Sequence, residues 1–239
     1  MADYVMADIH GNTQRFESVM NKIRLKPEDT LYILGDVIDR YEDGIRILRK
    51  LKDIPNVKIL RGNHEQMLLD AVGTSGELAP LDEEKMNLWM HNGGDVTLKY
   101  LKHIRKQTRR EIAEYISTLP FSYEITVSGK AYLLVHAAPP TLYNKNHPRY
   151  GGYRNPEQLT IWYRMRYEDP VPTGYTLIFG HTPTIFYQDG EPLRMFYDVD
   201  RIALDCGSGL APKGSPFYYA DGRLACLRLD DMKEFYSDC

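Results

Sequence analysis

The sequence predicts a fold of the α/β (α+β) class, and two observations lead to this prediction. Short apolar strands alternate with amphipathic helices in the first third of the chain, with strands expected at 4–7, 31–35 and 57–60. Strand patterns dominate the C-terminal half, at 122–127, 131–135, 175–179, 202–205 and 224–229. The N-terminal repeat indicates βαβ units with right-handed crossovers, and therefore parallel strands.

Three helices are expected between and after the first strands. The first should begin at Asn12 or Thr13, and the third should begin near His64 and end at Gly73, a plausible C-cap. Apolar residues at helical spacing mark the buried faces of the first two helices: Phe16, Val19, Met20, Ile23, Ile45, Leu48 and Leu51.

Residues 73–120 interrupt the strand–helix rhythm. A helical pattern covers 83–90, Gly93-Gly94 breaks it, and a charged helix is expected over 109–119. We expect a helical insertion that packs beside the main body, so that residues 1–239 form a single domain. The part of this insertion around Trp89 and His91 could form a partial lid or simply pack.

Composition excludes several classes of protein. The chain has 239 residues, of which 43% are hydrophobic, and its formal net charge of -3 gives no overall basic surface, so we expect no nucleic-acid partner. No stretch approaches the roughly 20 apolar residues of a membrane span, and no signal peptide is recognisable. We therefore expect a cytoplasmic protein without a membrane partner. Cys206 and Cys226 lie in strand-like contexts typical of buried thiols.

Five of the expected strands run directly into polar residues that can bind a metal. These residues are Asp8, His10, Asp36, Asn63, His64, His136 and His181. In α/β proteins, binding sites form at the carboxyl ends of strands, so these side chains should line one edge of the sheets. A mixture of carboxylate, amide and imidazole donors suits borderline divalent ions such as Mn, Fe or Zn.

Each of these signals has an ordinary explanation when it is taken alone. An Asp such as Asp8 often caps a helix, and a histidine at a strand end, such as His136 or His181, is usually structural. The run from Gly35 to Arg40 is more informative, because two carboxylates and an arginine directly follow a strand. The complete set in this order is not explained by unrelated local roles.

The chain resembles the calcineurin-like metallophosphoesterases in five blocks: Asp8-Ile9-His10-Gly11, Gly35-Asp36-Val37-Ile38-Asp39-Arg40, Gly62-Asn63-His64-Glu65, His136-Ala137 and Gly180-His181. Asp39-Arg40 and Ile161-Trp162-Tyr163-Arg164 resemble the PPP-type branch and its bacterial and phage-like serine/threonine phosphatases. The similarity extends to about Asp230. It implies a four-layer α/β/β/α sandwich of two mixed sheets flanked by helices.

The resemblance implies a centre of two divalent metal ions, with Mn expected first and Fe or Zn as alternatives. The first ion would be held by Asp8, His10 and Asp36. The second would be held by Asp36, Asn63, His136 and His181, with Asp36 bridging the two ions. A hydroxide bridging the ions would attack the phosphorus atom in line with the leaving group.

The resemblance also implies roles for side chains that do not bind metal. His64 would protonate the leaving oxygen, and Asp39 would orient its imidazole. Arg40 and Arg164 would bind the phosphate oxygen atoms. Arg40 could instead form a structural salt bridge, and Arg164 could be a solvated charge, in which case Arg166 would bind the phosphate.

The function predicted first is hydrolysis of phosphomonoesters, with phosphoserine and phosphothreonine in proteins as the leading substrates. The alternative is hydrolysis of dinucleoside polyphosphates such as diadenosine tetraphosphate. Glu65 favours the first, because the dinucleotide enzymes tend to have Asp at that position of the block. A non-catalytic metal- or partner-binding module is a remote third possibility. Tyr41, where the family usually has Gly, could narrow the phosphate pocket or stack on a substrate.

Overall fold

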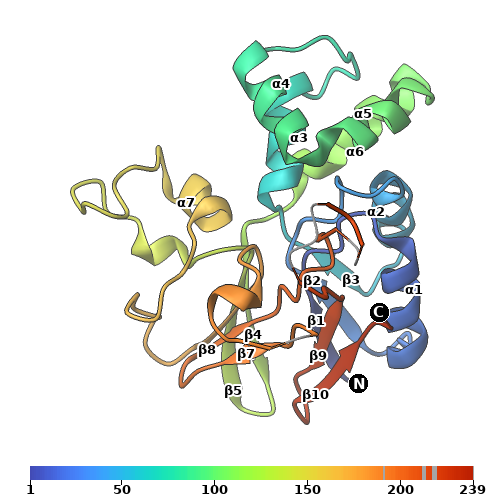
Figure 1. Cartoon of the computed structure of the whole chain (residues 1–239). Coiled ribbons are helices and arrows are strands. Elements are labelled where there is room, and N and C mark those ends of the chain that lie inside the picture. Colours follow the sequence, from blue (N-terminus) through green and yellow to red (C-terminus); the bar gives the residue numbers. More distant parts are fainter. Residues whose placement is uncertain (191, 212–213, 217–219, 239) are drawn as a thin grey trace.

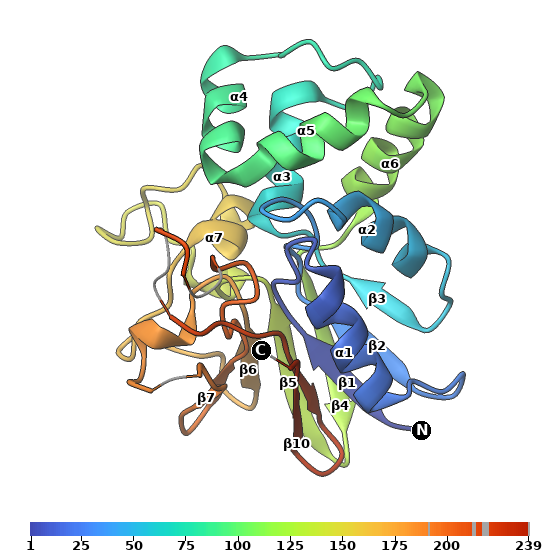
Figure 2. The same cartoon turned by 45° about the vertical axis from the view of Figure 1, so that its right-hand side comes forward.

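Two five-stranded sheets pack face to face in the computed structural model, and helices cover their outer faces (Figure 1, Figure 2). The structure describes residues 1–190, 192–211, 214–216 and 220–238. Both sheets mix parallel and antiparallel pairs. The predicted sandwich of two mixed sheets flanked by helices is confirmed.

The first sheet and its helices come from the first third of the chain and from its C-terminal end. They are β1 (Asp3–Met6), α1 (Thr13–Ile23), β2 (Thr30–Ile33), α2 (Gly44–Lys52), β3 (Val57–Ile59), α3 (Asn63–Val72), β9 (Ala225–Arg228) and β10 (Lys233–Tyr236). The strand order is β10-β9-β1-β2-β3. The three N-terminal strands pair in parallel, as predicted, and β9 and β10 add an antiparallel edge.

The second sheet comes from the second half of the chain. Its elements are β4 (Ser122–Val127), β5 (Lys130–Val135), η2 (Pro140–Leu142), α7 (Pro156–Trp162), β6 (Thr176–Phe179), η3 (Thr184–Phe186), β7 (Phe196–Tyr197) and β8 (Arg201–Ala203). The strand order is β4-β5-β6-β8-β7. The central strands β5, β6 and β8 are parallel, so their carboxyl ends lie at one edge of the sheet.

A helical segment lies between the two halves of the sandwich in the sequence. It consists of α4 (Glu83–Trp89), the π-helical turn η1 (Met90–Gly94), α5 (Asp95–Lys102) and α6 (Lys106–Thr118). Figure 1 shows these helices together at the top of the molecule, near α3. Gly93, at φ 90°, kinks the chain where the sequence predicted a break. α5 was not predicted, and α6 begins three residues before the expected helix.

Side-chain alternation along the strands explains the layers. In β1, Met6 packs with the helices, whereas Val5 points into the space between the sheets. In β6, Ile178 points into that same space, whereas Phe179 packs against the outer layer that contains α7. Because neighbouring side chains of a strand face opposite ways, strands that are buried on both faces require four layers.

The helix boundaries follow the local signals in the sequence. Asn12 caps α1, since its side-chain oxygen accepts the Arg15 amide hydrogen at 3.2 Å. α3 ends at Gly73, at φ 67°. Trp89 of α4 and residues of α5 and α6 belong to the same buried cluster as α1 and α2. This shared core supports the organisation of residues 1–239 as one domain, which stays a prediction.

None of the helices in the described part of the chain is both long and apolar enough to cross a lipid bilayer. The thiols of Cys206 and Cys226 are buried and free, as the sequence predicted. Burial raises the pKa of both thiols, so they remain protonated.

We expect Leu34→Ala to lower the free energy of unfolding by about 2–5 kcal/mol, because Leu34 is 0% exposed and fills the space between the sheets. Equilibrium unfolding in urea measures this change. Val199→Ala is the control, because Val199 is 99% exposed, and it should shift stability by no more than about 0.5 kcal/mol. Equal effects of the two substitutions would contradict this description of the core.

Candidate metal centre

The predicted metal ligands converge where strand ends of both sheets meet. Asp8, His10, Asp36 and Asn63 follow strands of the first sheet, and His136 and His181 follow strands of the second. The most exposed of these six side chains, His181, is only 8% accessible. The backbone amide of His181 donates to the carboxylate oxygen atoms of Asp8, at 3.1 and 3.0 Å, and thereby ties the two sheets together at the site.

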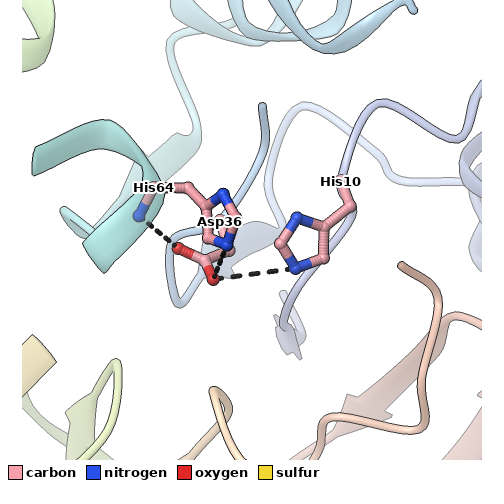
Figure 3. A group of neighbouring side chains, drawn as sticks. All are labelled: His10, Asp36 and His64. Atoms are coloured by element: carbon pink, nitrogen blue, oxygen red, sulfur yellow. Dashed lines mark hydrogen bonds and ion pairs between the residues drawn. The ribbon is translucent and has the colours of Figure 1, made fainter. Parts of the chain in front are cut away.

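The carboxylate of Asp36 lies at the centre of a first group of possible ligands. Its Oδ2 atom is 3.7 Å from Nε2 of His10 and 3.8 Å from Nε2 of His64 (Figure 3). Its Oδ1 atom accepts the backbone amide hydrogen of His64 at 3.1 Å. The three side chains offer ligand atoms close enough to hold one cation. His64 thus belongs geometrically to a group from which the sequence-based hypothesis excluded it as a ligand.

A second group shares Asp36 with the first. Nε2 of His136 is 3.5 Å from Oδ1 of Asp36, and His181 completes the group. The amide oxygen of Asn63 is 2.9 Å from Nε2 of His136 and 2.9 Å from Nδ1 of His181. Because Asp36 is common to both groups, its two oxygen atoms are suited to bridge two cations.

Backbone carbonyl groups determine which nitrogen atoms of the imidazoles face the centre. Nδ1 of His136 donates to the Leu34 carbonyl at 2.7 Å, and Nδ1 of His10 donates to the Ile38 carbonyl at 3.1 Å. Since a carbonyl oxygen can only accept, these nitrogen atoms carry the protons, and each Nε2 lone pair faces the centre. Both rings are therefore in the form that binds metal.

The pKa values of the cluster also favour metal binding. Burial would raise the pKa of Asp36, but the surrounding imidazoles, His136 first, hold it well below its usual range. Burial lowers the pKa values of His10, His136 and His181. The lowered pKa values of these three imidazoles favour their neutral form, which is the form that can bind a metal ion.

Asp8 lies outside both groups. Burial raises its pKa well above the usual range, and the nearby carboxylates of Asp205 and Asp36 raise it further. Asp205, which is 4% exposed, lies at the end of the strand that the sequence predicted at 202–205 and was not among the predicted site residues. Buried carboxylates that repel one another need a cation nearby if all are to ionise. The residues present thus fit divalent cations by both donor type and charge.

His64 and Asp39 form a buried pair beside the candidate ligands. Nδ1 of His64 donates to Oδ2 of Asp39 at 2.7 Å, and both side chains are at most 1% exposed. Burial would lower the pKa of His64, but Asp36 and the hydrogen bond to Asp39 raise it above its usual value. Nη2 of Arg40 is 3.4 Å from Nε2 of His64, so two cationic groups can face the same position.

Glu65 organises the loops that carry Asp36 and Asn63. Its carboxylate accepts the amide hydrogens of Asp36 at 2.9 Å, Val37 at 2.8 Å and Gly62 at 3.0 Å. Burial and the charge of Asp36 raise the pKa of Glu65 to about 7. In the sequence, Glu65 was part of a motif and distinguished the two candidate substrates, and this structural role was not predicted. Its position three residues after Gly62, at the start of a helix, is the signal that predicts such a cap.

The two candidate arginines differ in what they contact. Nη1 of Arg164 donates to the carbonyl of His181 at 3.3 Å, beside the second group of ligands. The backbone of Arg166 instead contacts Asp169 and Arg201. These contacts favour Arg164 as the residue beside the centre. The hydroxyl of Tyr41 donates to the Leu210 carbonyl at 2.9 Å.

A family profile described as calcineurin-like phosphoesterase matches residues 4–204 of the chain. The chain belongs to the calcineurin-like phosphoesterase family. The match covers the strand ends that carry Asp8, Asp36, Asn63, His136 and His181, so the buried cluster lies within the family's domain.

Relatives within this family carry different names. A serine/threonine-protein phosphatase 2 of Escherichia coli is 31% identical over 57% of this chain and 58% of its own length. A symmetrical bis(5'-nucleosyl)-tetraphosphatase of Salmonella paratyphi C is 24% identical over 98% of this chain and 94% of its own. The crystal structure of a metallophosphoesterase from Sphaerobacter thermophilus has the same fold, with a TM-score of 0.54 and 15% identity over 99% of this chain and 87% of that one.

We expect Asp205→Asn to flatten the pH dependence of stability in the metal-free protein. Burial raises the pKa of Asp205 to about 6 in the folded chain, against about 3.9 in an unfolded chain. The unfolded chain loses this proton first, so the stability that depends on the protonated group is lost as the pH rises from about 4 to about 6. The loss amounts to at most about 3 kcal/mol.

Urea unfolding in the presence of a chelator, at several values between about pH 4 and 7, measures this effect. Glu17→Gln on the exposed face of α1 controls for removal of one carboxylate. If Asp205→Asn and the wild type lose the same stability over this range, then Asp205 does not retain its proton in the folded state.

Proposed function

We propose that this protein is a metal-dependent hydrolase of phosphomonoesters, with phosphoserine and phosphothreonine residues of proteins as its leading substrates. The observation that carries the proposal is the sharing of Asp36 between two buried ligand groups, directly beside the His64–Asp39 pair. The family membership supports the reaction class, and the relative named serine/threonine-protein phosphatase 2 supports the substrate.

The ligands proposed for the ions are Asp8, His10 and Asp36 on one side and Asp36, Asn63, His136 and His181 on the other. When bound, two divalent ions supply charge that stabilises the phosphoryl oxygen atoms and lower the pKa of water to near neutrality. We propose Mn²⁺ first, with Fe or Zn as alternatives, because the donors are a mixture of oxygen and nitrogen atoms.

His64 is the proposed general acid. Its Nδ1 atom is bound to Asp39, so Nε2 is the nitrogen that faces the centre. Although burial opposes it, the charge of Asp36 and the hydrogen bond to Asp39 raise the pKa of His64, which favours the protonated ring. A proton held on Nε2 can be given to the leaving oxygen as the bond to phosphorus breaks, so that the product departs as an alcohol.

Arg40 and Arg164 are the proposed phosphate-binding residues. The Arg40 guanidinium approaches Nε2 of His64, and Arg164 approaches the backbone of His181, so the two lie beside opposite ligand groups. A planar guanidinium can donate two hydrogen bonds to phosphate oxygen atoms at once. The two side chains would thereby orient the phosphoryl group between the two ligand groups.

A second candidate function is the hydrolysis of dinucleoside polyphosphates. The relative with this printed activity aligns with 98% of the chain. A cavity of about 450 Å³ between α3 and α7, lined among others by Met67, Phe121 and Trp162, has the size of a small-molecule site. Trp162, which lines this cavity, also reaches the centre, since its carbonyl oxygen lies 3.2 Å from Nε2 of His181. Glu65 remains the residue that favours the first candidate.

The partners proposed are phosphoproteins or small phosphoesters, without a membrane or a nucleic acid. Location in the cytoplasm stays a prediction from the sequence. A non-catalytic role is the remaining alternative, and a chain that binds metal but hydrolyses no phosphoester would support that role.

We expect His64→Asn to lower kcat by roughly 10²–10⁴-fold on a phosphoserine peptide while the metal content stays unchanged. The general acid would be lost, but the proposed ligands would be retained. Steady-state kinetics with metal analysis by mass spectrometry test this expectation. His103→Asn, at an exposed position after α5, is the matched control and should keep full activity. Unchanged turnover in His64→Asn would exclude His64 from the reaction.

The two candidate substrates can be compared directly. A phosphoserine peptide and diadenosine tetraphosphate would be supplied to the same Mn²⁺-loaded protein. We expect kcat/KM to be higher for the peptide. The reverse order would assign the chain to the dinucleotide activity.

A further inference from the structure

The helical segment α4–η1–α5 contacts Asp39 and Arg40 in the loop after β2. Asp39 orients the proposed general acid His64, and Arg40 is a proposed phosphate-binding residue. The indole Nε1 of Trp89 donates to Oδ2 of Asp39 at 2.9 Å. The amide of Arg40 donates to the Gly93 carbonyl at 2.9 Å, and the amide of Asp39 donates to the hydroxyl of Thr97 at 3.2 Å. The segment therefore holds a side chain and two backbone groups of this loop.

These contacts hold the loop in a conformation that its residues would not adopt readily. Asp39 and Arg40 have φ values of 71° and 67°, in the left-handed region that side chains other than glycine disfavour. Consecutive residues in this region persist only where the surroundings fix them. The three contacts come from elements about 50 to 60 residues further along the chain.

The indole of Trp89 and the imidazole of His64 bind the same carboxylate oxygen. Oδ2 of Asp39 accepts from both rings, whereas Oδ1 has no hydrogen-bond partner in the part of the chain that the structure describes. Trp89 and Asp39 are each 0% exposed. An indole N–H can donate but cannot accept, so it fixes the direction of the carboxylate without taking a proton from it.

The Gly93-Gly94 break makes this approach possible. A Cβ atom on Gly93 would lie 3.0 Å from Cγ of Arg40, and one on Gly94 would collide with the indole of Trp89. With φ at 90°, Gly93 also turns the chain where its carbonyl accepts from Arg40. The two glycines thus allow the helical segment to lie directly on Asp39 and Arg40.

We propose that Trp89 is a positioning residue for proton transfer: it holds the Asp39 carboxylate so that His64 presents Nε2 to the leaving oxygen. This inference rests on the proposed function and assigns part of it to the helical segment, which the sequence could interpret only as packing or a partial lid. Without the indole, the carboxylate can rotate, and the imidazole that it orients loses its alignment with the leaving group.

The experiment compares Trp89→Phe with the wild type, both loaded with Mn²⁺, on substrates that differ in their need for a proton. The leaving group of p-nitrophenyl phosphate, p-nitrophenolate, departs without being protonated. The leaving oxygen of phosphoserine must be protonated as the bond to phosphorus breaks. We expect kcat to fall by no more than about 3-fold on p-nitrophenyl phosphate and by roughly 10–100-fold on a phosphoserine peptide. An equal fall on both substrates would overturn the proposal, as would no fall on either.

Two further variants separate positioning from packing. Ile116→Val trims a side chain of α6 that is 0% exposed and should leave the ratio of the two rates unchanged. In a His64→Asn background, Trp89→Phe should add no further selectivity, because the two residues act through one proton. If the double variant instead changed the ratio of the two kcat values by the product of the two single effects, Trp89 would act independently of His64.

A measurement without substrate separates the failure of this inference from failure of the proposed function. In metal-free, ¹⁵N-labelled protein, at a pH high enough for the His64 ring to be neutral, the imidazole resonances report which nitrogen of His64 carries the proton. We expect the Nδ1-protonated ring that faces Asp39 in the wild type and a measurable population of the other tautomer in Trp89→Phe. Identical His64 spectra in both proteins would overturn the positioning role, whether or not the wild type hydrolyses phosphoesters.

Discussion

The carboxylate of Asp36 is the group on which the rest of the site depends. It lies 2% exposed among the imidazoles of His10, His64 and His136, at 3.5 to 3.8 Å. An ionised carboxylate at such a depth is costly unless cations or hydrogen-bond donors compensate it. The carboxylate of Glu65 accepts the backbone amide hydrogen of Asp36, and it also accepts that of Gly62 at the start of α3. One buried charge thus connects the first sheet, the second sheet and the start of a helix.

Unusual backbone geometry concentrates around this carboxylate. Non-glycine residues with positive φ gather at the site: Asp8, His10, Asp36, Asp39, Arg40 and His181. Each such conformation costs about 1–3 kcal/mol and is retained where the surroundings enforce it. Here the enforcement comes from contacts across the whole fold, such as the amide of His181 on Asp8 and the carbonyl of Gly93 on Arg40. These backbone conformations therefore lower the stability of the folded chain at the site, and they fix the positions of the candidate metal ligands.

Much of this arrangement could be predicted from the sequence, because the rule that sites form at strand ends is local. Each apolar run that stops at Asp8, Asp36 or His136 identifies a residue at the edge of a sheet without knowledge of the other strands. Helix boundaries at Asn12 and Gly73 were also readable, because caps act within one turn.

The features that escaped prediction depend on distant partners. Trp89 is separated from Asp39 by 50 residues, and the chain kinks at Gly93, four residues after Trp89. The strand β7, of two residues, exists only through its pairing with β8. α7 begins at Pro156, at the end of a stretch rich in Pro, Gly and Tyr that resembles a surface loop. No local pattern of the sequence contains such information, because tertiary packing decides it.

The central claim is that Asp36 joins two groups of side chains into one metal centre. The most direct test is to measure how many ions the protein binds and whether its activity rises as they bind. Metal-stripped protein would be dialysed against increasing Mn²⁺, and bound metal and hydrolysis of p-nitrophenyl phosphate would be measured on the same samples. We expect about two ions per chain at saturation, with turnover restored as they bind, and loss of both ions in Asp36→Asn. Binding of less than about one ion per chain would show that the strand-end side chains do not form a shared metal centre.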